Sequence, residues 1–338
     1  MKALMSHVAG GPETLVLEEV PDPSFGPKDL LVDVEAVGIN FPDGLFIRDL
    51  YQVKPPRPFA PGGEFCGVVL QTGAEVANFE AGDRVIGRCG WGALAERIAI
   101  EADRCIVVDE KTPPIEAAGF MFTYATALYA LRNVAELRTG ERVLVLGAAG
   151  GVGAAAVEVA RTLGGQVFAA ASNDEKLRFA LACGAQGGLV YPRELTNNAA
   201  RKELADAFKA LSNGRGFDVV VDPVGGAYTE PAVRALTHGG RHLVIGFAAG
   251  IPSLPLNLLL LKSGRVMGVD WRALLNIDPN TNANNVSDLL KMWSSGEISP
   301  KVSQVFEFSE APRAIASLEN RSAVGKLVVR VKQSDGPA

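Results

Sequence analysis

The chain has 338 residues, of which 48% are hydrophobic and 21% are charged, and its formal net charge is −5. This length suffices for two domains with sizeable cores, and the composition excludes a disordered or collagen-like chain. The negative balance, without any block of Lys and Arg, argues against a nucleic-acid-binding protein.

The sequence also indicates where the protein resides. Its N-terminus lacks an apolar segment of signal-peptide length, and an apolar run such as 256–261 is too short to cross a bilayer. We therefore expect a cytoplasmic protein without a membrane partner. The cysteines form no CxxC pair, so reduced structural thiols are expected at Cys66, Cys89, Cys105 and Cys183.

The first third, residues 1–122, is predicted to be β-rich. Short apolar runs such as 30–37 and 67–70 are separated by frequent Pro and Gly. Turn signals at this spacing indicate a small barrel-like or sandwich unit.

In residues 123–271, strands alternate with helices, which indicates an α/β domain. The expected strands are 142–146, 166–171, 217–221, 241–245 and 265–269, with a short apolar run at 189–191. The helices expected between them are 154–163, 174–183, 199–211 and 229–236. Because the strands are apolar almost throughout, both faces of the sheet must be covered, which is typical of a parallel sheet.

Residues 272–338 form the last predicted segment. A helix is expected near 286–293, followed by a strand at 305–308, a helix at 310–318 and a strand at 326–331. We expect the final strand to return to the first domain.

A glycine-rich turn carries the main functional signal. Residues 148–153 read Ala-Ala-Gly-Gly-Val-Gly and lie between a predicted strand and a predicted helix, which is the context of a dinucleotide-binding fingerprint with alanine in place of its first glycine. Gly150 would let the backbone approach a pyrophosphate, and Gly153 would let the helix pack closely. The N–H groups of the first helical turn would hold the anion. The expected cofactor-binding residues here are Ala149, Gly150, Gly151, Val152 and Gly153.

A turn that needs small residues only for packing is the alternative. The strand–helix units that follow the turn favour the dinucleotide site. A nucleoside-triphosphate loop is excluded because no Lys-Ser/Thr follows the glycines.

The end of the strand 166–171 indicates which dinucleotide is bound. NAD enzymes usually place Asp or Glu there, whereas this strand is followed by Ser172 and Asn173, with Lys176 in the next helix. Hydroxyl, amide and ammonium groups all donate hydrogen bonds and suit the 2′-phosphate of NADPH. We therefore predict NADPH; the alternative is that Lys176 is a solvated helix lysine.

Five segments resemble the medium-chain dehydrogenase/reductase superfamily, in its quinone oxidoreductase (zeta-crystallin-like) branch. They are 37–43 (VGINFPD), 61–67 (PGGEFCG), 81–85 (AGDRV), 147–153 and 324–327 (VGKL). The resemblance covers nearly the whole chain, and the order and spacing of the segments make it specific. It implies a GroES-like catalytic domain made of both chain ends, a doubly wound Rossmann domain between them, and commonly a homodimer formed through the Rossmann sheets.

The resemblance also implies that this protein binds no metal. Zinc alcohol dehydrogenases of the superfamily have a cysteine near position 40 and a histidine in a Gly-His-Glu motif, where this chain has Asn40 and Gly63. Neither residue is a usual zinc ligand. Without zinc, the acceptor must be polarised by hydrogen bonds or be electrophilic already, as quinones and α,β-unsaturated carbonyls are.

By the same resemblance, three residues are expected to be catalytic. Asn40 would lie beside the nicotinamide and donate to the substrate carbonyl; the alternative is an amide that stabilises the turn before Pro42. Tyr51 would border the substrate cleft and donate a proton or hydrogen bond, with a plain wall aromatic as the alternative. Thr126 would contact the nicotinamide carboxamide. Asp43 is expected to order its loop rather than act as an acid.

Further cofactor contacts are expected by the same comparison. Tyr191 and Arg321 would lie around the adenosine phosphate, and Val224 and Phe247 would lie at carboxyl ends of the sheet, where ligands collect. Lys326 would reach the cofactor from the returning segment, with a surface lysine as the alternative. His242 lies inside an apolar strand, so a structural histidine with its hydrogen bonds satisfied is expected there.

NADPH-dependent quinone reduction is the leading hypothesis. Reduction of an activated C=C bond, in an enal, enone or enoyl thioester, uses the same hydride and the same metal-free cleft. A non-catalytic NADPH-binding protein, structural or regulatory, is the alternative from another class. The presence of Asn40, Tyr51 and Thr126 together argues against it.

Overall fold

The chain forms two compact units in a computed structural model that describes residues 1–332. Unit 1 combines Met1–Phe122 with the segment that begins at Pro300, and unit 2 is Thr123–Ser299. The predicted segment 272–338 is therefore divided: only the part from Pro300 onward joins the first unit. Its last residues, 333–338, lie outside the described part of the chain.

Hydrogen bonds explain why residues 272–299 stay with unit 2. Helix α10 (Pro279–Ser294) is bonded to a π-helical turn at Tyr129–Val134. Arg132 pairs with Asp288 at 2.9 Å, and Asn285 donates to Asn133 at 2.8 Å. These contacts join the helix to the nucleotide-binding unit, where the sequence prediction had placed a returning segment.

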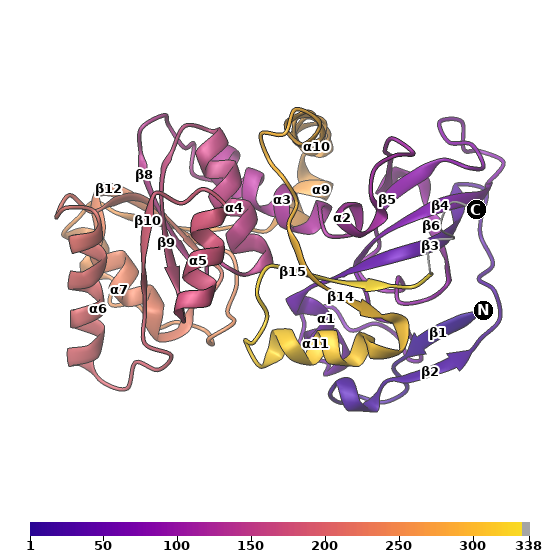
Figure 1. Ribbon diagram of the computed structural model, residues 1–338, viewed down its shortest axis with the longest axis horizontal. Helices are drawn as coiled ribbons and strands as arrows, with labels where there is room; N and C mark the ends of the chain where they lie inside the picture. The colour runs from indigo at the N-terminus through magenta and orange to yellow at the C-terminus, as the bar shows by residue number, and fades with distance from the viewer. Residues whose placement is uncertain (333–338) are drawn as a thin grey trace. The chain divides into compact units, whose positions relative to one another are not determined.

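Unit 1 is built on a seven-stranded sheet with the strand order β14-β15-β3-β4-β5-β7, in which β6 also pairs with β3 (Figure 1). The C-terminal strand β15 pairs with β3 from Leu327↔Ile39 to Arg330↔Ala36, so the two chain ends share one sheet. Strand β3 is buried along most of its length, in keeping with its central place. The strands of this sheet are β3 (Asp29–Ile39), β4 (Glu64–Thr72), β5 (Arg84–Arg88), β6 (Arg97–Glu101), β7 (Cys105–Val107), β14 (Val302–Glu307) and β15 (Lys326–Arg330). Strands β1 (Lys2–Met5) and β2 (Val16–Glu19) form a separate two-stranded sheet, and the helices are α1 (Phe41–Ile47), α2 (Pro114–Ala118) and α11 (Ala311–Glu319).

Unit 2 contains a six-stranded parallel sheet with the order β10-β9-β8-β11-β12-β13. Helices α4 and α5 lie on one side of this sheet, and α6 and α7 lie on the other (Figure 1). The predicted doubly wound α/β class is confirmed. The strands are β8 (Arg142–Leu146), β9 (Gln166–Ala171), β10 (Gly187–Val190), β11 (Phe217–Asp222), β12 (Leu236–Val244) and β13 (Arg265–Gly268), and the helices are α3 (Met121–Leu128), α4 (Gly151–Thr162), α5 (Asp174–Ala182), α6 (Asn198–Leu211), α7 (Thr229–Arg234), α8 (Asn257–Leu260), α9 (Trp271–Ile277) and α10.

All four cysteines are free thiols, as the sequence predicted. Burial raises the pKa of the Cys66 and Cys105 thiols to about 12, so both are held protonated and unreactive. None of the helices within residues 1–332 has the length and hydropathy of a membrane-spanning segment.

Candidate active site

The glycine turn, residues 147–153, connects β8 to α4. Gly147 has a φ of +55°, a conformation that suits glycine, so it makes the tight turn. The predicted fingerprint placed its first position at Ala148 and treated that alanine as a defect. In the structure the residue with the left-handed turn conformation is Gly147, one position before this fingerprint.

Two other glycines, Gly153 and Gly150, shape the start of α4 at this turn. A Cβ on Gly153 would lie 2.2 Å from the Gly147 carbonyl oxygen, so α4 packs on the turn only without a side chain there. Gly150 is the N-cap residue of α4 and caps the helix with no side chain. The amides of Gly151, Val152 and Gly153 therefore begin the helix without intrahelical acceptors, an arrangement that suits an anion. Ala149 is buried just before them.

The β9–α5 junction lies beside the glycine turn because β9 pairs in parallel with β8, with Leu146 opposite Ala170. Asn173 is the N-cap of α5, and its Oδ1 accepts the Lys176 backbone N–H at 2.8 Å. Part of the amide predicted to bind phosphate is thus used to cap the helix. Ser172 and the Lys176 side chain are half-buried at the same edge.

Three further predicted residues of unit 2 lie at or near the carboxyl edge of the sheet. Val224 follows β11, and its Cγ2 would be 2.8 Å from a Cβ placed on Gly147, so it faces the glycine turn directly. Phe247 follows β12 and is 44% exposed. Tyr191 follows β10, but its ring is 7% exposed and packs against Tyr228, with ring centroids 4.9 Å apart. The structure therefore places the Tyr191 ring in the core of the unit.

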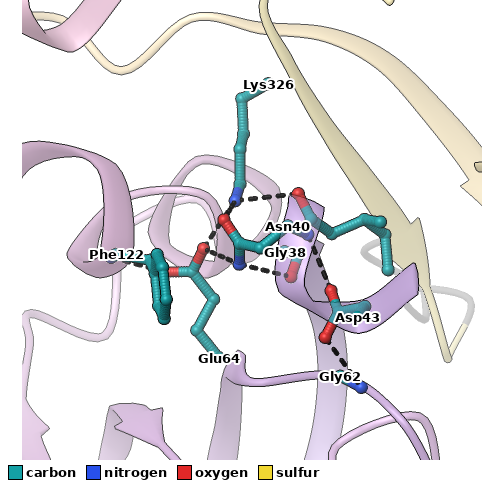
Figure 2. Close-up of polar contacts among 8 residues, drawn as sticks. Gly38, Asn40, Asp43, Gly62, Glu64, Phe122 and Lys326 are labelled. Carbon is teal, nitrogen blue, oxygen red and sulfur yellow. Dashed lines mark hydrogen bonds and ion pairs between the residues drawn. The ribbon is translucent and has the colours of Figure 1, made fainter. Parts of the chain in front are cut away.

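Unit 1 contains a polar cluster of Asn40, Asp43, Glu64 and Lys326 (Figure 2). The Lys326 ammonium donates to Glu64 Oε1 at 2.6 Å, to Asn40 Oδ1 at 2.7 Å and to the Ile39 carbonyl at 3.0 Å. The side chains of Glu64 and Lys326 are 0% and 7% exposed. The alternative of a surface lysine at 326 is therefore wrong.

The sheet register assembles this cluster. Glu64 opens β4 and Lys326 opens β15, and both strands pair with β3 near its end, as Gly38↔Glu64 and Leu327↔Ile39. Asn40 follows β3 directly and is the N-cap of α1. Three segments far apart in sequence thus meet at one end of the sheet.

Asn40 has no spare amide proton in this arrangement. Its Nδ2 donates to Glu64 Oε1 at 2.9 Å and to the Gly38 carbonyl at 3.2 Å, while its Oδ1 accepts from Lys326. The predicted donation from Asn40 to a substrate carbonyl would have to replace one of these bonds. The Asn40 amide therefore bonds to other groups of the protein and stabilises the turn before α1.

Asp43 ties two backbone segments to the cluster. Its carboxylate accepts the Asn40 N–H at 2.7 Å and the Gly62 N–H at 3.3 Å, which agrees with the predicted loop-ordering role. Burial raises the pKa of the Asp43 carboxyl to about 7, and the charge of Glu64 adds to this; the Asn40 N–H and the Lys326 ammonium act in the opposite direction. The cluster therefore changes its charge near neutral pH.

The remaining predicted residues are divided between the two units. Tyr51 is half-buried in unit 1, and its ring centroid lies 4.6 Å from that of Phe46. Arg321 is exposed in unit 1, just after α11, with a φ of +54°. Thr126 lies on α3 in unit 2 and is 7% exposed.

Two functional candidates were missed by reading the sequence. Glu64 follows Gly62-Gly63 at the start of an apolar strand, and Asp222 directly follows the predicted strand 217–221, just before Pro223. An acid at either position was a detectable signal, because a carboxylate next to a buried strand needs partners. Among the described residues, no three His, Cys, Asp or Glu side chains are grouped so that they could hold a metal ion.

Two family models and similar curated proteins point to the same group of dehydrogenases. Residues 26–110 match the alcohol dehydrogenase GroES-like domain, and residues 151–291 match the zinc-binding dehydrogenase family model. Quinone oxidoreductase-like protein 2 of Rattus norvegicus is 37% identical over 322 residues, covering 95% of this chain and 90% of the relative.

Solved structures extend this likeness to the whole fold. The quinone oxidoreductase from Thermus thermophilus, solved also in complex with NADPH, is 36% identical with a TM-score of 0.83, over 98% of this chain and 100% of that one. The CurK enoyl reductase is 25% identical with a TM-score of 0.85, over 98% of this chain and 99% of that one.

Proposed function

Because the chain belongs to the quinone oxidoreductase family of the medium-chain dehydrogenase/reductase superfamily, we propose that it is an NADPH-dependent quinone reductase that works without a metal. The polar cluster supports an acceptor that needs no polarisation by the protein. All three ammonium protons of Lys326 and both amide protons of Asn40 are engaged inside it. With these donors occupied, the cluster favours an acceptor that is electrophilic by its own conjugation, such as a quinone or an α,β-unsaturated carbonyl. The likeness to quinone oxidoreductases favours the quinone.

The residues of unit 2 fit a dinucleotide phosphate. Gly147 and Gly153 allow the tight turn and the close start of α4, and the amides of 151–153 point their N–H groups out of the start of that helix. These amides would hold the pyrophosphate, and Ser172 and Lys176 would bind the 2′-phosphate. When bound, NADPH supplies the hydride.

The chain's own residues would orient the acceptor and exclude water. We assign the ring of Tyr51, packed on Phe46, to border the acceptor and offer its hydroxyl. Thr126 would orient the nicotinamide carboxamide. The polar cluster would hold the end of β3 and the start of α1 rigid.

A comparison of acceptors tests this assignment. NADPH oxidation would be measured with 1,4-benzoquinone, a 2-alkenal and crotonyl-CoA under identical conditions. We expect the highest kcat/KM with the quinone. Rapid turnover of the alkenal or of crotonyl-CoA, with no turnover of the quinone, would show a C=C reductase instead, the reaction class suggested by the likeness to CurK enoyl reductase. Tight NADPH binding without turnover of any acceptor would indicate the non-catalytic alternative.

We also propose that the protein is a homodimer joined along β13. This strand ends the parallel sheet, and the preceding segment exposes Leu256, Leu260 and Leu261 by 73–81%. An open strand edge beside exposed leucines is a favourable surface for association. Light scattering should give a dimeric mass for the wild type and a monomeric mass for Leu260→Asp. The control Leu50→Asp, at a leucine 69% exposed on unit 1, should remain dimeric.

A further inference from the structure

Asp222 gathers the loops at the carboxyl edge of the unit 2 sheet. It is the last residue of β11, and its side chain is 2% exposed. Its Oδ1 accepts the backbone N–H of Val224 at 2.9 Å and of Gly225 at 2.8 Å. Its Oδ2 accepts the Thr229 hydroxyl at 2.7 Å and faces His242 Nε2 at 3.0 Å. One carboxylate thus fixes the loop that follows β11, the start of α7 and the middle of β12.

His242 bonds to Asp222 through Nε2, and its other ring nitrogen, Nδ1, is left without a hydrogen-bond partner in the described part of the chain. A carboxylate can only accept, so the ring proton lies on Nε2 and points to Asp222. The ring is fully buried, and Nδ1 has no hydrogen-bond partner within residues 1–332. The sequence had suggested a fully satisfied structural histidine; the structure satisfies only one of its two nitrogens. A buried unpaired polar atom is unfavourable and calls for an explanation in function.

The loop that Asp222 fixes, residues 223–226, lies against the glycine turn. Val224 packs on Gly147, and its carbonyl accepts the Ala249 N–H at 2.7 Å, which joins the loop after β11 to the loop after β12. Strands β8, β9 and β10 form one half of the sheet, and β11, β12 and β13 form the other. In a doubly wound sheet each half binds one mononucleotide, and the ligand crosses at the point where the strand order reverses. The glycine turn and β9 serve the adenosine half, so the Asp222 loop faces the nicotinamide half.

We propose that Asp222 and His242 are a positioning pair that holds the 223–226 loop for the nicotinamide half of the dinucleotide. His242 donates to Asp222, the carboxylate fixes the amides of Val224 and Gly225, and the fixed loop then holds the Val224 side chain in place against the glycine turn for the ligand. This inference rests on the proposed NADPH site and adds the residues that shape its nicotinamide half. Neither side chain touches the reacting atoms, so both act through the loop.

Two ligands separate this role from general stability. Adenosine 2′,5′-bisphosphate contains only the adenosine half with its 2′-phosphate, whereas NADPH contains both halves. For His242→Leu we expect the Kd of NADPH to rise about tenfold and the Kd of the bisphosphate to change less than about twofold, since a hydrogen bond to a charged group is worth about this factor. His242→Gln places an amide donor near the position of Nε2 and should restore NADPH affinity. Thr229→Val, which removes another donor to the same carboxylate, should show the same selectivity and provides the test if His242→Leu does not fold.

The outcomes are distinct. Selective loss of NADPH affinity, with rescue by His242→Gln, supports the positioning pair. Equal loss of both ligands in His242→Leu and Thr229→Val, or no loss in either variant, overturns it while leaving the NADPH site intact. Failure of the wild type to bind NADPH or the bisphosphate would overturn the proposed function and this inference with it.

Discussion

Removing the buried ammonium of unit 1 is the most informative perturbation of its stability. Lys326→Met would leave the Glu64 carboxylate, 0% exposed, with only the Asn40 amide and the Phe122 N–H at 2.8 Å. It would also remove the donor to Asn40 Oδ1 and to the Ile39 carbonyl. Methionine fills a similar volume, so lost charge pairing rather than a cavity would dominate.

The expected cost is large compared with the stability of a domain. Breaking a buried ion pair from one side costs about 3–5 kcal/mol, because the remaining charge stays buried without its partner. For a unit of this size, such a loss lowers Tm by on the order of 10 °C. Native domains are stable by only about 5–15 kcal/mol, so Lys326→Met should be folded but much weakened.

Urea unfolding followed by the fluorescence of Trp91 measures this cost. Trp91 reports on unit 1, and replacing Trp271 and Trp293, which lie in unit 2, with Phe isolates its signal. The matched control is Lys332→Met, because Lys332 pairs with Asp33 at the surface and is 45% exposed. The control should change the free energy of unfolding by less than about 1 kcal/mol.

The double variant Lys326→Met/Glu64→Gln separates charge from shape. It removes the unpaired charge, and the single Gln oxygen can still accept from one of the two former donors, the Asn40 amide or the Phe122 N–H. We expect it to recover at least half of the lost stability. A Lys326→Met loss as small as that of Lys332→Met, or no recovery in the double variant, would refute the role of charge pairing in this cluster.

Three further outcomes are expected. Gly153→Ala should abolish detectable NADPH binding and destabilise unit 2 by about 1–3 kcal/mol, because the new Cβ would lie 2.2 Å from the Gly147 oxygen. The control is Gly268→Ala, whose Cβ would meet nothing within 4 Å, and titration calorimetry should show that it binds NADPH as the wild type does. Lys176→Ala should raise the Kd of NADPH about tenfold to a hundredfold and leave the Kd of NADH nearly unchanged, because only NADPH has the 2′-phosphate. Equal losses of affinity for both cofactors, or the same loss in the neighbouring Arg178→Ala, would contradict a contact between Lys176 and that phosphate. The pKa of Asp43 is raised in the fold to about 7, above its ordinary value of 3.8, so the fold binds this proton more tightly than the unfolded chain does. The stability it contributes is complete below pH 4 and is lost as pH rises to about 7; Asp43→Asn, which stays neutral, should flatten the pH dependence of urea unfolding in that window, and an unchanged slope would exclude this titration.

The parallel sheet of unit 2 could be predicted because its signals are local. Each strand is a short apolar run followed by a turn, and this pattern is independent of what the strand pairs with. Boundaries were less accurate: α10 begins at Pro279, earlier than the predicted 286. The missed signal was Asp278, whose Oδ1 caps the helix by accepting the Thr281 N–H, followed by a proline in the first turn.

The glycine turn could be recognised from sequence alone, but the residue with the left-handed conformation within it could not. Both Gly147 and Ala148 precede Gly150, and only the backbone conformation identifies Gly147 as the turn residue. The residues after β9 could likewise be named, whereas the capping bond of Asn173 depends on how α5 begins.

The polar cluster of unit 1 could not be predicted from local patterns. Glu64 and Lys326 are separated by 262 positions in the chain, and they meet only through the pairing of β4 and β15 with β3. The resemblance to known dehydrogenases pointed to Asn40, Asp43 and Lys326 one by one, but not to Glu64 or to the hydrogen bonds that join the four residues. Its hydrogen bonds, which decide whether it can donate to a substrate, depend on this long-range register.

Single-turnover hydride transfer tests the central claim most directly. The protein, loaded with one equivalent of NADPH, would be mixed rapidly with 1,4-benzoquinone while the near-ultraviolet absorbance of NADPH is followed, and the same mixture without protein gives the background rate. We expect the protein-bound NADPH to be consumed much faster than the background, with one hydroquinone formed for each NADPH oxidised. A rate equal to that of the protein-free mixture would contradict the assignment of this protein as an NADPH-dependent quinone reductase.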